Sequence, residues 1–272
     1  MRSKRIIGII DYGVGNHSSV VHTLRPMGYR CCVSRDQEEL AETDLLLLPG
    51  VGAFPHAMDA LHRLDLIQFL QNQARENKPI VGICLGMQLL AESSTEIAFT
   101  AGLDLIPGKV ESLGIDQWHI GWNNMEVVVD DSIFRKYNSQ SLYFNHSYVF
   151  HLPKEYLVAV SRFESLSEPF PIAVRSNNVV GLQFHPEKSQ VIGKQLLADV
   201  IEMAENDKMA ELAELAELTK FINDLKYNYF LSDGDNVKIR RTYNYKSKKG
   251  RETEDCYLEV NGEKITISKN IV

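Results

Sequence analysis

The sequence predicts an α/β fold, a three-layer αβα sandwich built on a mixed, largely parallel sheet. Two observations support this. Short apolar runs typical of strands alternate with stretches of helical periodicity. Some of these runs, such as Leu45 to Leu48, are apolar at every position, which is typical of strands covered on both faces. The 272 residues leave room for a main domain at 1–204 and a small α+β extension at 205–272.

The first part of the chain supplies the parallel strands and their helices. Strands are expected at 6–10, 31–33, 44–48 and 80–83, and helices at 18–27, 55–61, 66–75 and 87–92. Ligands bind at the carboxyl ends of parallel strands, so the loops that follow 44–48 and 80–83 are expected to share one crevice. Gly13 and Gly15 lack the third glycine of a dinucleotide fingerprint, which favours a plain turn there.

Short strands with tight turns are expected in the second part of the chain. They are predicted at 109–112, 125–129, 141–144, 157–161, 172–175 and 179–184, followed by a helix at 190–204. In the extension, apolar residues at alternating spacings of three and four predict a helix. These are Leu215, Leu218, Ile222, Leu225 and Tyr229. Strands are expected at 237–245 and 257–267, with Asn261-Gly262 as a hairpin turn.

Composition excludes several functional classes. The net charge of −7 argues against a general nucleic-acid binder, and the basic run at 238–251 is better explained as a solvated hairpin face. No apolar stretch is long enough for a membrane span or a signal peptide. The four cysteines show no C-x-x-C spacing, so neither a disulfide framework nor a metal site is expected. These features predict a cytoplasmic protein without a cofactor.

The run Gly82-Ile83-Cys84-Leu85-Gly86 lies between an expected strand and an expected helix. In that context a nucleophile flanked by glycines two residues away predicts a sharp turn that lifts Cys84 into a pocket. Backbone N–H groups at the start of the helix would favour a thiolate, and the Leu85 N–H would face an oxyanion. The alternative is a buried cysteine before an ordinary turn.

A second candidate group follows the strand at 179–184. Pro186 restricts His185 to extended geometry, and Glu187 lies two residues on, on the same side of an extended chain. An imidazole within reach of Cys84 could accept its proton, and a carboxylate behind the ring would fix the tautomer. A surface His-Pro turn is the alternative when this segment is considered alone.

Taken together, these segments resemble the class I glutamine amidotransferases, and most closely the glutaminase subunits of imidazole glycerol phosphate synthase. The resemblance covers roughly residues 5–204 and rests on six segments in the family's order. They are Asp11–Asn16, Pro49–Phe54, Gly82–Gln88, Gly121–Asn123, Tyr143–Tyr148 and Gln183–Ser189.

The resemblance implies hydrolysis of L-glutamine to glutamate and ammonia. Cys84 would form a γ-glutamyl thioester, His185 would move the proton, and Glu187 would orient His185. The oxyanion would be held by Leu85 and by the loop Gly50-Val51-Gly52, which in this family is thought to rearrange when a partner binds. The glutamine would be held by Gln88, Ser147 and Tyr148.

The resemblance also implies a heterodimer with a (β/α)₈ barrel synthase of histidine biosynthesis. The ammonia path and the partner face would include Asn16, Trp122, Asn123 and Lys188. For Trp122 a buried packing role is the alternative. Similar proteins supply ammonia to sugar amidotransferases of surface-polysaccharide or flagellin-glycan pathways. An inactive glutamine-sensing subunit, or a cysteine hydrolase acting on other amides, is a further alternative.

Overall fold

The computed structural model describes residues 5–114, 118–163, 166, 168–202, 237–244, 253–260 and 263–266, the last three ranges as backbone only. The chain divides into two compact units, residues 1–211 and 212–272, and each is considered by itself. In the part of the chain that is described, no helix is both long and apolar enough to cross a membrane.

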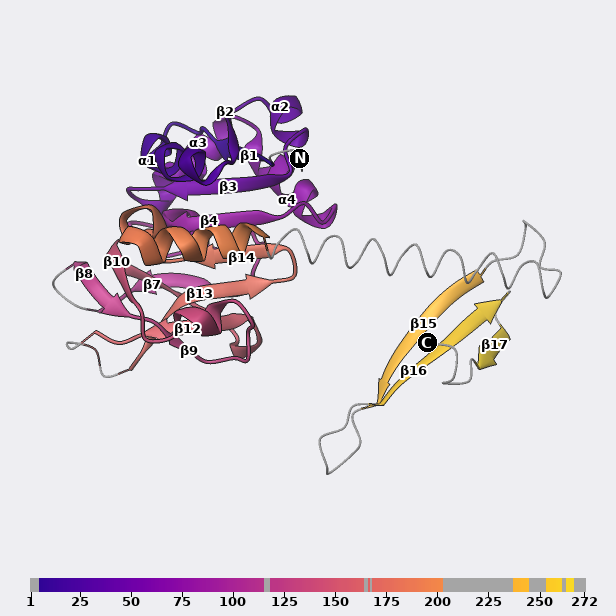
Figure 1. Cartoon of the computed structure of the whole chain (residues 1–272). Coiled ribbons are helices and arrows are strands. Elements are labelled where there is room, and N and C mark those ends of the chain that lie inside the picture. The colour runs from indigo at the N-terminus through magenta and orange to yellow at the C-terminus, as the bar shows by residue number, and fades with distance from the viewer. Residues whose placement is uncertain are drawn as a thin grey trace. The chain divides into compact units, whose positions relative to one another are not determined.

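The first unit is built on an eight-stranded mixed sheet (Figure 1). Five neighbouring strands are parallel, in the order β2 (Arg30–Ser34), β1 (Ile6–Ile10), β3 (Leu45–Gly50), β4 (Ile80–Cys84) and β14 (Val179–Leu182). The sheet continues antiparallel through β13 (Phe170–Ser176), β12 (Leu157–Ser161) and β9 (Glu126–Val127).

Helices cover both faces of this sheet, which confirms the three-layer prediction. Leu45 and Leu47 of β3 belong to one apolar cluster, together with residues of α1 (His17–Leu24) and of the helix at 190–202. The alternate residues of β3 belong to a second cluster, formed with α2 (Gln37–Ala41), α3 (Phe54–Arg63), α4 (Leu66–Arg75) and α5 (Leu85–Leu89). The unbroken apolar run of β3 is therefore explained by burial on both sides.

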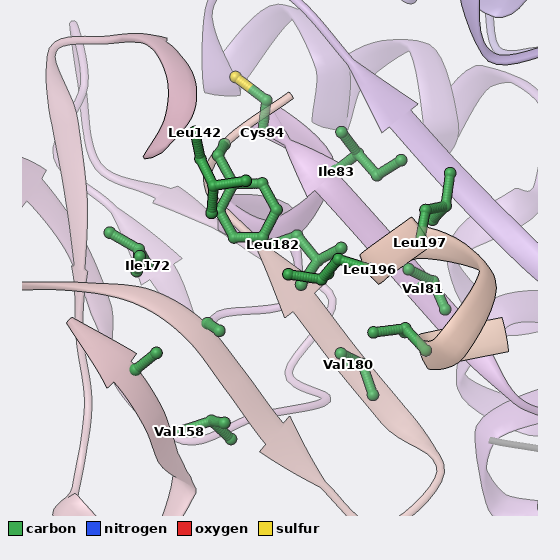
Figure 2. Close-up of a cluster of buried hydrophobic side chains, with 14 of the residues drawn as sticks. Val81, Ile83, Cys84, Leu142, Val158, Ile172, Val180, Leu182, Leu196 and Leu197 are labelled. Carbon is green, nitrogen blue, oxygen red and sulfur yellow. The ribbon is translucent and has the colours of Figure 1, made fainter. Parts of the chain in front are cut away.

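The helix at 190–202 lies over β4 and β14, as the orange ribbon in Figure 1 shows. Its Leu196 and Leu197 pack with Val81, Ile83 and Val180 in the cluster drawn in Figure 2. This packing holds β4, which ends at Cys84, and β14, which ends shortly before His185.

Two smaller sheets complete the first unit. β8 (His119–Asn124) pairs antiparallel with β10 (Ser141–His146). The other sheet runs in the order β11 (Tyr148–His151), β7 (Lys109–Ser112), β5 (Ser93–Ser94) and β6 (Thr100–Ala101). Short 3₁₀ turns occur at Arg25–Met27, Phe134–Tyr137, Lys154–Tyr156 and Pro186–Lys188.

The sequence did not predict the strands β5, β6, β8 and β11 or the helix α2. β8 carries a glycine and two asparagines, which have low strand propensity, and it forms because β10 pairs with all six of its residues. The strand expected at 125–129 is reduced to β9, since Val128 and Val129 are exposed at the sheet edge. The helix expected at 87–92 begins earlier, at Leu85, directly after the strand.

The second unit contains an antiparallel sheet of three strands, β15 (Val237–Asn244), β16 (Thr253–Val260) and β17 (Glu263–Thr266). The strand expected at 237–245 is β15. The segment expected at 257–267 with a hairpin turn inside it corresponds to the antiparallel pair β16 and β17, except that β16 begins earlier, at Thr253. The helix predicted from Leu215 to Tyr229, the turn at Asn261-Gly262 and the basic residues at 246–251 lie outside the described residues.

Candidate active site

Cys84 occupies a strained backbone turn between β4 and α5. Its φ of 55° and ψ of −111° are unusual for a residue with a side chain. The strand-to-helix reversal is that of a nucleophile elbow, which presents the side chain at the end of the sheet. Figure 2 shows the Cys84 sulfur directed away from the apolar cluster on which its backbone rests.

The two glycines that flank Cys84 are required by close backbone packing. A Cβ placed on Gly86 would overlap the Leu48 carbonyl of β3. A Cβ on Gly82 would lie 2.5 Å from the Gly86 carbonyl oxygen and 2.8 Å from the Met87 nitrogen. The G-x-C-x-G spacing therefore lets the end of β4 and the start of α5 approach each other and β3 closely enough to form the turn.

The glycine loop after β3 lies directly beside Cys84, because Gly50 pairs with Cys84 in the β3–β4 register. A Cβ on Gly50 would lie 2.8 Å from the Leu85 Cβ and 2.8 Å from the Tyr12 hydroxyl. That hydroxyl donates a hydrogen bond to the Pro49 carbonyl at 2.7 Å. Burial, with the nearby charge of Cys84 adding to it, raises the pKa of Tyr12, so the hydroxyl stays a donor.

His185 is held against Cys84 by its backbone. Its N–H donates to the Tyr143 carbonyl at 2.9 Å, and its carbonyl accepts from the Ser189 hydroxyl at 2.7 Å. The ring Nδ1 lies 2.8 Å from the Glu187 Oε1, and the ring lines the same pocket as Cys84, close enough for the two side chains to interact electrostatically. Since Nδ1 faces the carboxylate, the other ring nitrogen is available to the sulfur.

The charges of Cys84 and Glu187 favour the protonated form of the His185 ring. Burial by itself lowers the pKa of His185, but the hydrogen bonds and charges of Cys84 and Glu187 outweigh burial and raise the pKa to about 9. Glu187 is buried with His185, and its Oε2 has no hydrogen-bond partner among the described residues. A protonated ring beside the sulfur is positioned to act as a general acid towards a leaving group in the pocket.

This pKa predicts how stability changes with pH. His185 binds its proton more tightly in the folded chain than at its ordinary pKa of 6.5, so its contribution is complete below pH 6.5. We expect about 3 kcal/mol of unfolding free energy to be lost as the pH rises through 9. Urea unfolding at pH 6 and pH 10 measures this loss. The loss should shrink in Glu187→Gln, and an equal loss in that variant would contradict the prediction.

A cavity of about 520 Å³ opens beside these groups. Cys84 and His185 line it together with most of the residues that the sequence predicted for glutamine binding. Those are Val51, Gly52, Leu85, Gln88, Ser147 and Tyr148. Gly50 and Glu187 lie behind the lining, against Leu85 and His185 respectively. Segments from four separate parts of the chain thus meet at one pocket.

Several residues at the site were not among those predicted. The buried Gln183 donates from Nε2 towards the Cys84 sulfur at 3.9 Å and accepts from the Gln88 Nε2 at 3.1 Å. The Asn145 carbonyl lies 3.7 Å from the same sulfur. Glu96 and Trp118 line the pocket from loops. Asn145 and Gln183 belong to segments that carry the family resemblance, but the sequence did not predict that they contact the Cys84 sulfur. Glu96 and Trp118 are single loop residues without periodicity, so no local signal placed them in the pocket.

The four residues expected at a partner face differ from one another in their exposure and in their contacts. Trp122 is 45% exposed and contacts Tyr143 edge to face, with ring centroids 5.7 Å apart. The exposed Lys188 lies over the same Tyr143 ring, 5.9 Å from its centroid. Asn16 caps α1 by accepting from the Ser19 N–H, and it is partly exposed. The Asn123 side chain hydrogen-bonds to His119 and to the Arg162 carbonyl.

Comparison with known proteins agrees with this geometry. Residues 8–204 match the family model described as glutamine amidotransferase class-I. The imidazole glycerol phosphate synthase subunit HisH of Listeria innocua is 41% identical over 210 residues, covering 76% of this chain and all of that protein. HisH of Bacillus cereus strain AH187 is 40% identical, covering 76% of this chain and 99% of that protein.

Solved structures agree on the fold. A crystal structure of a glutamine amidotransferase superposes with a TM-score of 0.60 at 20% identity, covering 73% of this chain and 98% of that one. The structure of PurLQS from Thermotoga maritima gives a TM-score of 0.59 at 19% identity, covering 74% and 99%. By its sequence match over residues 8–204 and by its fold, the chain belongs to the class-I glutamine amidotransferase family.

Proposed function

We propose that this chain is the glutaminase subunit of an imidazole glycerol phosphate synthase, producing ammonia for a partner subunit in histidine biosynthesis. The observation that carries the proposal is the line of Cys84, His185 and Glu187 at one side of a 520 Å³ pocket. The two HisH relatives, which the chain covers almost completely, support this pathway over sugar amidation.

In this proposal Cys84 is the nucleophile. The thiol proton passes to His185 and the sulfur attacks the side-chain carbonyl carbon of glutamine, while the Leu85 N–H, with the Gly50-Val51-Gly52 loop, stabilises the oxyanion. The C–N bond then breaks, and His185 gives its proton to the departing ammonia. Water attacks the γ-glutamyl thioester, and His185 takes a proton from that water. The C–S bond then breaks, glutamate leaves, and His185 returns the proton to the sulfur to restore the thiol. Glu187 keeps the ring oriented throughout.

In this proposal the Glu96 carboxylate binds the α-ammonium group of glutamine. It is the one carboxylate among the residues that line the described pocket. Its Oε2 accepts the Phe54 N–H at 2.8 Å, which anchors the side chain and leaves Oε1 for a ligand. Burial raises the pKa of Glu96, and the Phe54 hydrogen bond opposes that shift, so a bound cation would favour the carboxylate.

Glu96→Gln is therefore expected to raise KM for glutamine by about 10- to 100-fold, with a smaller change in kcat. The amide retains an acceptor for the Phe54 N–H and removes only the charge. Glutamate formation by the chain with its partner measures both constants. Glu92→Gln, an exposed residue outside the pocket lining, is the matched control. An unchanged KM in Glu96→Gln would remove this residue from the substrate site.

The partner we propose is a (β/α)₈ barrel synthase that forms a heterodimer with this chain. The exposed Trp122 and Lys188 both contact the half-buried Tyr143 ring close to His185, and they support a partner face here. We further propose that residues 1–204 are the amidotransferase domain and that 205–272 is an extension with a separate role. The match of the family model to residues 8–204 supports this division.

The purified complex, isolated through a tag on this chain, tests the proposal. With ¹⁵N-amide-labelled glutamine and the acceptor of imidazole glycerol phosphate synthases, the label is expected in the imidazole product, with a transient thioester on Cys84. A panel of asparagine, peptide amides and simple amides should not be hydrolysed. Glutamine hydrolysis without labelled imidazole product would reject the pathway, and absence of hydrolysis would reject the glutaminase assignment.

A further inference from the structure

Gln183 is a buried amide beside the nucleophile, and it has no role in the mechanism above. It directly follows β14, is completely buried, and its backbone N–H donates to the Ile172 carbonyl of β13 at 2.8 Å. Its side-chain Nε2 lies 3.9 Å from the Cys84 sulfur, and its Oε1 lies 3.1 Å from the Gln88 Nε2. Burying an amide is costly unless its hydrogen bonds are made, so these two contacts are what allows Gln183 to be buried here.

The orientation of the Gln183 amide is determined by a backbone carbonyl two contacts away. The Tyr148 carbonyl oxygen lies 3.1 Å from the Gln88 Nε2, and an acceptor there requires the N–H side of the Gln88 amide. The second N–H of that nitrogen points at Gln183, which must then offer its oxygen. Turning over either amide, or both, would bring two oxygens or two nitrogens into contact. Gln183 therefore directs its N–H side towards the Cys84 sulfur.

The Cys84 sulfur contacts two polar groups of opposite character. The Asn145 carbonyl, 3.7 Å away, can only accept, and it accepts the S–H of the thiol. The Gln183 Nε2 can only donate, and among the described residues the sulfur is the acceptor that it faces. A hydrogen bond to an ionised acceptor is shorter and about twice as strong as one to a neutral acceptor. The 3.9 Å contact is therefore weak with the resting thiol and strengthens when the sulfur is negatively charged.

The sulfur carries negative charge twice in the proposed reaction. It does so when its proton has passed to His185 and it attacks the amide carbon, and again when the C–S bond of the thioester breaks and the electron pair returns to it. A donor that binds the sulfur more strongly in these states than in the resting thiol lowers the barrier of both steps. The Leu85 N–H acts on the carbonyl oxygen of the substrate instead, so the two donors have separate tasks.

We propose that Gln183 is a further catalytic residue, whose side-chain N–H stabilises negative charge on the Cys84 sulfur. Gln88 and the Tyr148 carbonyl hold the Gln183 amide in the orientation that presents this N–H. Gln88 and Tyr148 also line the pocket in which glutamine is proposed to bind, so the same contacts join the substrate wall to the nucleophile. The proposal rests on the glutaminase function for its effect on turnover, but not for its effect on the reactivity of the sulfur.

Alkylation of Cys84 by iodoacetamide tests the proposal on the full chain, without glutamine or a partner. The reagent reacts with ionised sulfur, and mass spectrometry of the peptide that contains Cys84 separates it from the other cysteines. At pH 7 we expect Gln183→Met to react about tenfold more slowly than the native chain. On the plateau at high pH, where the sulfur is ionised in both chains, the rates should agree within about twofold. Equal rates at pH 7 would overturn the proposal, and so would a deficit that persists on the plateau, because it indicates blocked access.

Turnover by the complex gives the second measurement. We expect Gln183→Met to lower kcat for glutamate formation about 10- to 50-fold and to change KM less than about threefold, because Gln88 keeps its bond to the Tyr148 carbonyl. Gln73→Met is the matched control, since Gln73 is a buried glutamine of α4 outside the pocket lining, and its kcat should stay within about twofold of the native value. A raised KM with unchanged kcat in Gln183→Met would assign Gln183 to substrate packing and overturn the proposal.

Gln88→Met tests the orientation of the amide while leaving Gln183 itself unchanged. Without the Gln88 N–H, the Gln183 oxygen loses its partner, and the amide can turn over so that its N–H is no longer held at the sulfur. We expect alkylation of Cys84 at pH 7 to fall about threefold in this variant. The double variant should react no more slowly than Gln183→Met alone, because the donor is already absent. Effects that multiply, to about thirtyfold, would overturn the proposal that Gln88 orients Gln183.

Failure of the glutaminase assignment would look different. In that case the native complex would form no glutamate, while the alkylation rates of the native chain and of Gln183→Met would still differ at pH 7. His185 and Glu187 are unchanged in all of these variants, so their effect on the sulfur is common to all and cancels in the comparison.

Discussion

Cys84→Ala is expected to lower the rate of glutamate formation from glutamine by at least about 10⁴-fold. The structure gives the reason: Cys84 is the residue that the strained turn presents to the pocket, and His185 and Glu187 are arranged behind its sulfur. Losing the nucleophile of a covalent mechanism removes the contribution of the whole group, because its partners have nothing to activate. The rate should be measured on the complex with saturating glutamine.

Cys31→Ala is the matched control for this experiment. Cys31 lies on β2, outside the pocket lining, and burial raises the pKa of its thiol, so it is a poor nucleophile. We expect its rate to stay within about twofold of the native chain. Circular dichroism should be unchanged in both variants. A Cys84→Ala complex that retained more than about one hundredth of the native rate would contradict the assignment of Cys84 as nucleophile.

Gly86→Ala is expected to destabilise the first unit by about 3 kcal/mol or more. The added Cβ would overlap the Leu48 carbonyl of β3, and backbone on both sides of the contact is held in the sheet or in α5. Relief therefore requires α5 to move away from β3, and that movement would also displace Leu85 and the Cys84 turn. Urea unfolding monitored by tryptophan fluorescence measures the change.

Gly13→Ala tests whether this cost comes from sterics alone. Gly13 has a positive φ of 82°, but a Cβ there would meet nothing within 4 Å. Its expected cost is about 1 kcal/mol, the price of a left-handed conformation for a residue with a side chain. If Gly86→Ala cost no more than Gly13→Ala, the close approach of α5 to β3 would not be the reason for glycine at residue 86.

Much of the main sheet could be predicted because its strands have strong local signals. β1, β3 and β4 are short apolar runs, and α3 and α4 have clear helical periodicity. These elements were predicted within a few residues of their observed bounds. β8 could not be, since its glycine and asparagines have no strand preference and its pairing with β10 depends on a partner 17 or more residues away.

The candidate site, like the sheet, could be predicted from the sequence only in part. The sequence determined that a cysteine between two glycines lies at the end of one strand and that a histidine with a nearby glutamate follows another. Residue types and short spacings of this kind can be read directly from the sequence. Only the tertiary structure decided that Gly50 lies beside Cys84, that Glu96 and Gln183 reach the pocket, and that His119 meets His146. Those contacts join residues distant in the chain, and sheet order and register, which local sequence does not encode, bring them together.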